Sequence, residues 1–330
     1  IPGLIDSHIH IAGAGGEGGP GTRTAELSFE KIVSSGITSV VGCLGTDGYT
    51  RRVDSVLMKA KGLKQQGISA WIYTGVYQVP PPTITGSVAR DLSLIDEVIG
   101  VGEIAISDHR SSYPTENEFI KLIQEAKIGG LIGGKCGIIN LHLGDEGKTF
   151  ELVDKVTKRS GISRQQFLPT HCNRSKRVFS EAMAYGKEGR IDLTTSSYPY
   201  YPDIEVKPSE GFFELLEAGI PVNHITMSSD SGGSLPIFDG NGNFLKSENG
   251  NPGSIYSEMQ DIFRQNKSML SKALQTVTSN VADILQLPRK GRIQRGNDAD
   301  LLVITEDDLK IQSVYARGKR VWQEAGADIG

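Results

Sequence analysis

The residues of this sequence best suited to chemistry are its histidines, because four of the six fall where predicted strands end. His8 and His10 close the first apolar run, and side chains two apart on a strand point to the same face. Both imidazoles can therefore share one cation, for which neutral imidazole is a good ligand. His142 and His171 end two later strands, and Asp230 follows the last one. This ring of four imidazoles and one carboxylate predicts a metal site.

These five ligands could serve one metal ion or two, and two ions need a bridging anion. Glu103, inside the apolar strand Val101–Ser107, is the candidate, because a carboxylate inside a barrel is costly unless cations or donors compensate it. The alternatives are an ion pair with Arg110 or a side chain that faces the surface. A carbamylated Lys135 is excluded, since it precedes His142 by about 20 Å of strand.

The elements that must position these residues alternate between β-branched apolar runs and helical patterns, which is typical of βαβ units. The predicted strands are Gly3–His10, Ile37–Gly45, Ile68–Tyr77, Val101–Ser107, Gly137–Leu143, Gln166–His171, Ile191–Thr195 and His224–Ser229. The predicted helices between them are Ser28–Ser35, Arg52–Gln66, Ser87–Ile99, Thr115–Ile128, Thr149–Lys158, Lys176–Gly189 and Ser209–Ala218. This order predicts an α/β fold of the (β/α)8 TIM-like barrel type, whose catalytic groups sit at the carboxyl ends of the strands.

Beyond the last barrel strand, the stretch Gly232–Ser254 is rich in Gly, Asn and Ser and is predicted to loop over the barrel mouth. Helices are expected at Ile255–Gln265 and Leu270–Leu287. The tail alternates charged and apolar residues, which indicates a small β element that needs partner strands. Because the chain opens on a strand at Ile1 with no Met, we expect it to be part of a longer protein whose N-terminal segment supplies those strands.

Composition excludes several classes of function. The 330 residues are 38% hydrophobic and 22% charged, as in ordinary globular proteins. The net charge of −4 and pI near 5.9 give no basic surface for nucleic acid or anionic membranes. No apolar run approaches the roughly 20 residues of a membrane span, and no signal peptide is visible. Cys43, Cys136 and Cys172 are an odd, scattered set that favours a reducing, cytoplasmic location.

Longer motifs carry a resemblance to a known family. The run Gly3-Leu4-Ile5-Asp6-Ser7-His8-Ile9-His10, with His142, His171 and Asp230, resembles the amidohydrolase superfamily of metal-dependent barrels. Within it, the sequence is similar to the isoaspartyl (β-aspartyl) dipeptidases along most of its length. The segments that carry this similarity are Gly15-Gly16-Glu17, Gly45-Thr46-Asp47, Thr74-Gly75-Val76-Tyr77, Ile106-Ser107-Asp108-His109-Arg110, Pro169-Thr170-His171-Cys172-Asn173-Arg174 and Ser228-Ser229-Asp230 with Ser234.

The resemblance implies a centre of two zinc ions. His8, His10 and Asp230 would hold the buried ion, and His142 and His171 the more exposed one. The family's usual bridge is a carbamylated lysine, and seven residues before Arg110 this chain has Glu103 instead. A glutamate offers the same pair of oxygens on a shorter stem, so we expect it to bridge the ions; loss of one metal is the competing possibility.

The resemblance also implies a domain plan and an assembly. Residues 1–290 would form the barrel, and residues 291–330, with the motif from Gly291 to Leu301, the C-terminal strands of a small β-sandwich. The protein would be a homo-oligomer, by resemblance an octamer.

The reaction implied is hydrolysis of the β-aspartyl bond of a small dipeptide by a metal-activated hydroxide. Asp230 would be the general acid and base, and Tyr77 would donate its hydroxyl to the developing oxyanion. The residues expected to bind the zwitterionic substrate are Glu17, Thr46, Tyr77, Arg110, Arg174 and Ser234. His109 and His224 are expected to be structural or to support the ligands.

Two rival functions are kept. A cyclic-amide hydrolase of the dihydroorotase or hydantoinase type would use the same barrel but would not need Glu17 to bind an ammonium group. A non-catalytic scaffold would have no use for the four histidines and Asp230.

Overall fold

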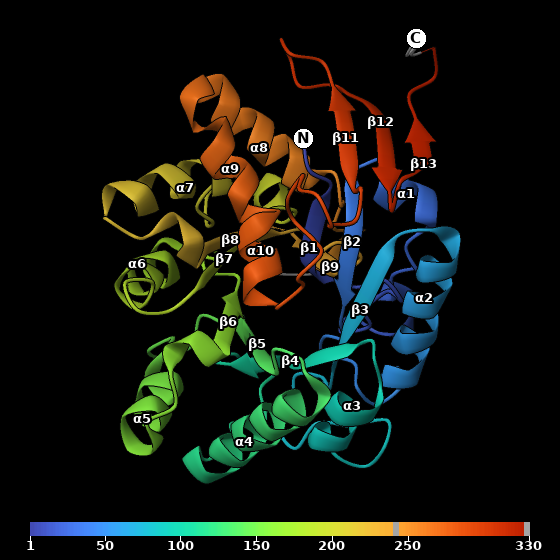
Figure 1. The fold of residues 1–330 in the computed structure, drawn as a ribbon. Helices are drawn as coiled ribbons and strands as arrows, with labels where there is room; N and C mark the ends of the chain where they lie inside the picture. The colour runs from blue at the N-terminus through green and yellow to red at the C-terminus, as the bar shows by residue number, and fades with distance from the viewer. Residues whose placement is uncertain (240–243, 327–330) are drawn as a thin grey trace.

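The eight predicted barrel strands are present in the computed structural model, which describes residues 1–239 and 244–326 (Figure 1). They are β1 Leu4–Ile9, β2 Ile37–Gly42, β3 Ser69–Thr74, β4 Val98–Ile106, β5 Ile138–Leu143, β6 Phe167–Thr170, β7 Ile191–Thr194 and β8 Ile225–Ser228. β1 to β6 form one parallel sheet in sequence order, and β7 pairs in parallel with β8.

Hydrogen bonds at two seams join these sheets into a closed barrel. The Asp230 amide donates to the His8 carbonyl at 3.0 Å, and Ile9 bridges Ser231 in parallel, which links β8 to β1. The Cys172 amide donates to the carbonyl of Asp192 at 3.2 Å, which links β6 to β7. The (β/α)8 TIM-like barrel expected from the alternating pattern is thus confirmed.

Helices surround the strands, and the last of them lies over one end of the barrel, where its Val281 and Leu285 belong to one core cluster with Ile5 and Tyr73 (Figure 1). They are α1 Phe29–Val33, α2 Val53–Gln66, α3 Val88–Leu94, α4 Glu116–Gly133, α5 Glu151–Ser160, α6 Lys176–Tyr185, α7 Pro208–Glu217, α8 Ser254–Gln265, α9 Leu270–Thr276 and α10 Ser279–Ile284. Short 3-10 turns are η1 Pro20–Thr22, η2 Arg164–Gln166, η3 Tyr198–Tyr200, η4 Val222–His224 and η5 Lys267–Met269.

Four predicted helices have the wrong extent. The helix predicted to end at Ile128 continues to Gly133, and the one predicted to end at Gly189 ends at Tyr185. The helix predicted over Ser87–Ile99 ends at Leu94, because the next apolar residues enter the barrel wall, where Val98 pairs with Ile72 of β3. The helix predicted over Leu270–Leu287 is split into α9 and α10. The break falls at two β-branched residues, Val277 and Thr278, and the backbone of Thr278 leaves the helical region at φ −138° and ψ −91°.

The stretch Gly232–Ser254 does lie at the barrel mouth, but it is not wholly irregular. It contains an antiparallel pair, β9 Ser234–Phe238 and β10 Phe244–Asn249, and its residues 240–243 lie outside the described residues. The pattern that predicts a strand is weak here, because Pro236 interrupts the apolar residues of β9 and β10 becomes polar after Leu245.

The tail forms the predicted small β element. β11 Leu301–Ile304, β12 Ile311–Ala316 and β13 Lys319–Gln323 make an antiparallel sheet. Ile1 and Leu302 exchange two backbone hydrogen bonds of 2.9 and 3.0 Å, so the first residues pair along β11. The boundary at residue 290 stays a prediction. Among the described residues, no helix combines the length and the apolarity needed to cross a bilayer.

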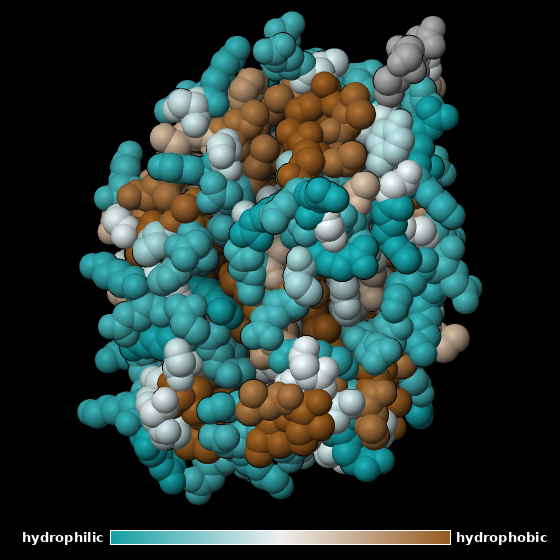
Figure 2. Space-filling view, viewed as in Figure 1, coloured by the Kyte–Doolittle hydropathy of each residue, from teal (hydrophilic) through white to brown (hydrophobic). Residues whose placement is uncertain are grey.

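Helix α4 shows how sequence determines both its ends and its packing. Thr115 and Glu118 form a reciprocal capping box at the N-terminus, and Gly134 ends the helix with φ 64°. Ile123 lies in the core at 0% exposure. On the opposite face Leu131 and Ile132 are 74% and 72% exposed, and Figure 2 shows apolar side chains gathered over α3 and α4.

We predict that Ile123→Ala destabilises the protein by about 2–5 kcal/mol, because it removes buried methyl groups and leaves a cavity. Ile293→Ala, which changes the same side chain at a position that is 64% exposed and lies outside α3 and α4, should stay within about 0.5 kcal/mol of the wild type. Urea unfolding followed by circular dichroism measures both values. Equal losses in the two variants would contradict the packing of α4.

Candidate active site

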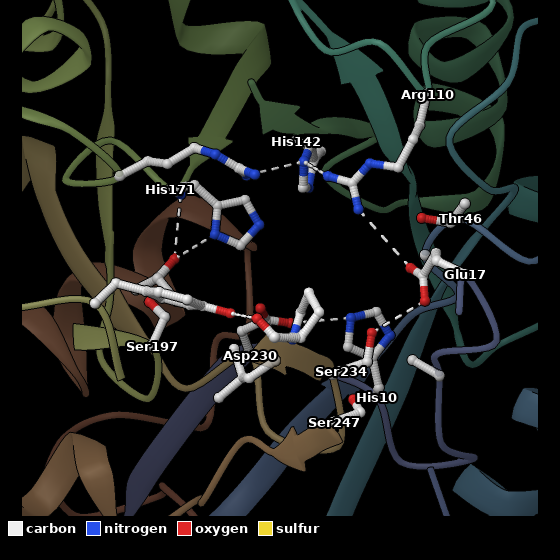
Figure 3. A pocket seen from close by; sticks show the side chains of 18 of the residues that line it. His10, Glu17, Thr46, Arg110, His142, His171, Ser197, Asp230, Ser234 and Ser247 are labelled. Carbon is white, nitrogen blue, oxygen red and sulfur yellow. Dashed lines mark hydrogen bonds and ion pairs between the residues drawn. The ribbon is translucent and has the colours of Figure 1, made fainter. Parts of the chain in front are cut away.

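A cavity of about 660 Å³ opens at the carboxyl ends of the barrel strands (Figure 3). Four of the predicted metal ligands and all six predicted substrate-binding residues line it: His10, His142, His171, Asp230, Glu17, Thr46, Tyr77, Arg110, Arg174 and Ser234. His8 and Glu103 lie beneath, at 0% and 1% exposure. The structure therefore brings all twelve predicted residues together at one end of the barrel.

Three residues directly beyond the strands have left-handed backbones. Ser107 follows β4 with φ 54°, His171 follows β6 with φ 61°, and Asp230 lies just past β8 with φ 54°. Residues other than glycine rarely adopt this region, and such strain persists where the surroundings determine it. The strained backbone turns the chain sharply at these three positions. Two of these residues, His171 and Asp230, have side chains that line the cavity.

Two imidazoles meet two carboxylates at the floor of the site. The His8 Nε2 atom lies 3.3 Å from Glu103 Oε2 and 3.8 Å from Asp230 Oδ1. The His10 Nε2 atom lies 3.0 Å from Asp230 Oδ1 and 3.9 Å from Glu103 Oε2. Asp230 is 15% exposed, so its carboxylate joins the buried cluster to the open cavity.

The other oxygen of Glu103 faces the second pair of histidines. Glu103 Oε1 lies 2.7 Å from His142 Nδ1 and 3.1 Å from His171 Nε2. The His171 Nδ1 atom is 2.7 Å from the Thr194 hydroxyl, which turns Nε2 toward the carboxylate. Glu103 therefore lies between the two histidine pairs, with one oxygen toward each.

Neither alternative interpretation of Glu103 is seen in the structure. Its side chain is 1% exposed, and Arg110 pairs with Asp108 and Glu17 instead. Burial raises the pKa of Glu103, but the neighbouring His8 and His142 bring it well below its ordinary value. The excluded Lys135 donates to the carbonyls of Leu92 and Ile95, away from the cavity.

The residues behind the histidines fix which nitrogen faces the site. His10 Nδ1 lies 3.2 Å from the carbonyl of Cys43, which assigns the proton to Nδ1 and leaves Nε2 as the ligand atom. His8 Nδ1 lies 3.3 Å from the hydroxyl of Thr170, which donates to Asp192 at 2.8 Å. Such outer contacts orient imidazoles for metal binding.

The donor set fits a metal ion. His8 Nε2 and Glu103 Oε2 are both buried, and neither has a hydrogen-bond partner among the described residues. Leaving such atoms unpaired is costly, whereas a cation between them would satisfy both. The possible ligand atoms form two groups, and within each group all of them lie within 4.8 Å of one another. One group comprises His8, His10, Cys43 and Glu103, and the other comprises Glu103, His142 and His171.

Glu17 occupies the rim opposite His171 (Figure 3). Its Oε2 atom accepts a hydrogen bond from the Ser234 hydroxyl at 3.0 Å, and its Oε1 atom lies 3.8 Å from Arg110. Thr46 lines the cavity nearby, and its buried hydroxyl has no partner among the described residues. This side of the cavity thus offers a carboxylate and a hydroxyl.

Asp108 is a site residue that the sequence analysis did not single out, although it lies in the motif before Arg110. It is 2% exposed, accepts two hydrogen bonds from the Arg110 guanidinium at 2.7 and 2.9 Å, and lies 3.0 Å from His142 Nε2. Burial raises the pKa of Asp108, but Arg110 and His142 bring it well below its ordinary value. Asp108 therefore holds Arg110 against the cavity wall.

Tyr77 and Arg174 converge on the same histidine. The Tyr77 hydroxyl lies 2.7 Å from His142 Nδ1, and Arg174 NH1 lies 3.2 Å from His142 Nε2. Burial and the charge of Glu103 raise the pKa of Tyr77 well above its usual range, so its hydroxyl keeps its proton. Arg174 also donates to Asp145 at 3.2 Å.

Glu205 is a second site residue that the sequence analysis missed, because it lies in an irregular segment far from any strand end. It lines the cavity and accepts a hydrogen bond from Ser197 at 2.7 Å. Burial raises its pKa to about 7. His109 is mostly exposed at the rim, and His224 lies 2.9 Å from the carbonyl of Gly186 outside the cavity, which agrees with the structural role expected for it.

A barrel whose mouth gathers four imidazoles and two carboxylates around unpaired buried atoms is of the class of metal-dependent barrel enzymes. A model of the amidohydrolase family matches residues 102–321. The chain belongs to this family.

Solved structures agree with this assignment. A β-aspartyl dipeptidase from Fervidobacterium islandicum AW-1, in complex with β-Asp-Leu dipeptide, is 41% identical with a TM-score of 0.90, over 97% of this chain and 84% of that one. A second structure of the enzyme from that organism is 38% identical with a TM-score of 0.88, over 99% and 84%. N-acetylglucosamine-6-phosphate deacetylase from Thermotoga maritima, at 18% identity and TM-score 0.61 over 98% and 89%, shares the fold.

The raised pKa of Glu205 predicts a pH-dependent stability. Its ordinary value is 4.5 and its value in the fold is about 7, so the folded state holds this proton more tightly than the unfolded state. The stabilisation is present below pH 4.5 and is lost as the pH rises through 7. Glu205→Gln has no carboxylate at this position and does not lose this stabilisation as the pH rises. The free energy of unfolding of the variant minus that of the wild type should therefore increase by about 1–2 kcal/mol from pH 5 to pH 8, a range that is discounted for solvent screening.

Urea titrations at fixed zinc concentration measure this difference, with Glu210→Gln on the exposed face of α7 as the control. A flat difference for Glu205→Gln across this range would contradict the burial of its carboxylate.

Proposed function

We propose that this protein hydrolyses the β-aspartyl bond of dipeptides. The observation that carries the proposal is the position of Glu17, a carboxylate held at the rim by Ser234 and Arg110, next to the histidine cluster. A β-aspartyl dipeptide has a free ammonium group and two carboxylates, so it needs an anion and several cations around the reacting bond. The similarity to an enzyme crystallised with β-Asp-Leu supports the same substrate class.

Two zinc ions are our proposal for the cofactor. His8, His10 and Asp230 would hold the buried ion, His142 and His171 the exposed one, with Glu103 shared between them. Imidazole nitrogen and carboxylate oxygen are donors that zinc accepts. When bound, the metal lowers the pKa of water toward neutrality and polarises a carbonyl group.

The chain's own residues then move protons and stabilise charge. Asp230 takes the proton of the attacking water and passes it to the leaving amine, which its partly open position permits. Tyr77 keeps its proton because it is buried, and it donates its hydroxyl to the oxyanion that develops on the β-carbonyl oxygen. The distance of 2.7 Å between the Tyr77 hydroxyl and His142 Nδ1 supports this role.

Substrate recognition follows from the remaining rim residues. Glu17 binds the ammonium group, and Arg110 and Arg174 bind carboxylates, for which the guanidinium fork is well suited. The unpaired Thr46 hydroxyl and the Ser234 hydroxyl complete carboxylate binding. The part of the cavity that these residues do not line is bounded by Tyr201, Ile204 and Leu235. The side chain of the leaving residue would lie there.

The two rival functions are less well supported. A cyclic-amide substrate has no ammonium group to occupy Glu17, and the hydantoinase structure that shares the fold is 16% identical. A scaffold would not keep buried imidazole and carboxylate atoms unpaired.

We propose two further properties. A homo-oligomer, by sequence resemblance an octamer, would cover the exposed side chains of Leu94, Leu131 and Ile132 on α3 and α4. A reducing, cytoplasmic setting is favoured by Cys43, Cys136 and Cys172, which are all unpaired.

Glu17→Gln should lower kcat/KM for β-Asp-Leu by about 10- to 100-fold, because it removes the charge that binds the ammonium group. Glu26→Gln, an exposed glutamate paired with Lys59, should leave the rate unchanged. The assay compares β-Asp-Leu, α-Asp-Leu and dihydroorotate. Hydrolysis of dihydroorotate in preference to β-Asp-Leu would overturn the proposed function, and an unaffected Glu17→Gln variant would remove its recognition argument.

Glu103→Gln should lower zinc stoichiometry and turnover together, with zinc binding at least about 100-fold weaker, since the variant loses a charged ligand of both ions. Atomic absorption after dialysis gives the stoichiometry. Glu97→Gln, directly before the first residue of the same strand and paired with Lys64, serves as the matched control. Unchanged zinc content and turnover in Glu103→Gln would show that it does not bridge.

A further inference from the structure

Cys43 is a buried nucleophilic group that the proposed reaction does not use. Cys43 is the residue directly after β2, the strand that pairs with β1. Its side chain is 0% exposed. Its backbone carbonyl already orients His10. The thiol itself lies 3.8 Å from His10 Nδ1 and 3.9 Å from the carbonyl of Ile9, which are long distances for hydrogen bonds. Within residues 1–239 and 244–326, no hydrogen bond shorter than these is found for this thiol.

The thiol lies within the buried donor group. One ligand atom from each of His8, His10, Cys43 and Glu103 falls within 4.8 Å of the others, and all four residues are buried. Two of these residues carry buried atoms, His8 Nε2 and Glu103 Oε2, that lie 3.3 Å apart and have no hydrogen-bond partner among the described residues. All four residues are buried, whereas Asp230 is 15% exposed.

The charges of the proposed centre also leave room for a thiolate. Two divalent ions would carry four positive charges, whereas the carboxylates of Glu103 and Asp230 and the hydroxide of the proposed reaction would supply three negative ones. A buried excess of charge is costly, and a thiolate would reduce it. Thiolate is moreover a strong zinc ligand, and a coordinated thiol is deprotonated outright.

We propose that Cys43 is a sulfur ligand of the buried metal position, sharing the ion with His8, His10 and Glu103. This inference rests on the proposed metal centre. On binding, the thiol releases its proton to solvent and the sulfur forms one bond to the ion, so no oxidant or reductant is needed. The softer donor set favours zinc or cobalt over magnesium or manganese.

X-ray absorption at the zinc edge tests the proposal on the wild-type enzyme loaded with zinc. We expect a sulfur scatterer at about 2.3 Å in addition to nitrogen and oxygen near 2.0–2.2 Å. The sulfur signal should be lost in Cys43→Ser. It should persist in Cys136→Ser, whose thiol instead donates to the carbonyl of Ile99 at 2.9 Å. In the cobalt-loaded enzyme, a near-ultraviolet thiolate-to-metal charge-transfer band should follow the same pattern.

The outcomes separate this inference from the proposed function. Zinc bound with only nitrogen and oxygen neighbours would overturn the role of Cys43, which would then be a small apolar side chain of the barrel interior, and would leave the metal centre intact. An enzyme that binds no zinc would overturn both. Because the wild-type spectrum decides the question by itself, a Cys43→Ser variant that fails to fold does not affect the test. If it folds, we expect at least tenfold weaker zinc binding.

Discussion

The burial of one carboxylate is the constraint on which the rest of the site depends. Glu103 is 1% exposed inside the barrel, where an isolated charge would be strongly disfavoured. It is tolerated because imidazoles approach both of its oxygens, His142 and His171 on one side and His8 on the other. These histidines lie in or directly after three different strands, β1, β5 and β6, so their convergence requires the barrel to be closed. The polar centre and the fold are therefore interdependent.

Closure of the barrel also explains where backbone strain is found. His171 and Asp230 are both left-handed, and each lies at a seam beside the two-stranded β7–β8 sheet. The Asp230 amide is held by the His8 carbonyl, and the His171 amide by the hydroxyl of Thr194. These hydrogen bonds offset a conformational cost of about 1–3 kcal/mol for each residue. The strained backbone conformation therefore occurs at residues that are proposed metal ligands.

The ligands could be predicted from sequence because strand ends are readable from local pattern. His8 and His10 follow from the two-residue period of a strand, and the mouth of a TIM barrel gathers such ends wherever they fall in the chain. The family resemblance added Glu17, which no periodicity would single out. The split between α9 and α10, and the β9–β10 pair, were missed because a short local break in a helical pattern and a short strand that contains a proline give weak signals in the sequence.

Asp108, Cys43 and Glu205 show what sequence reasoning leaves out in the site itself. Asp108 acts through Arg110 and His142, and its role appears only when β4 and β5 lie side by side. Cys43 follows β2, and its relation to His10 depends on the pairing of β1 with β2. A signal did exist for Asp108, since an acid two residues before Arg110 can pair with it. For Glu205 there was none, because its segment has no regular pattern.

The rim is organised as pairs of opposite charge, and this arrangement limits what can bind. Arg110 is held by two bonds to Asp108 while its other edge faces Glu17, and Arg174 is shared between His142 and Asp145. A ligand with one charge would leave part of this set unpaired, at a cost. A ligand that carries both an ammonium group and carboxylates can meet Glu17 and the arginines at once. The same pre-pairing holds the guanidinium groups in place before the substrate arrives, so less conformational freedom is lost on binding.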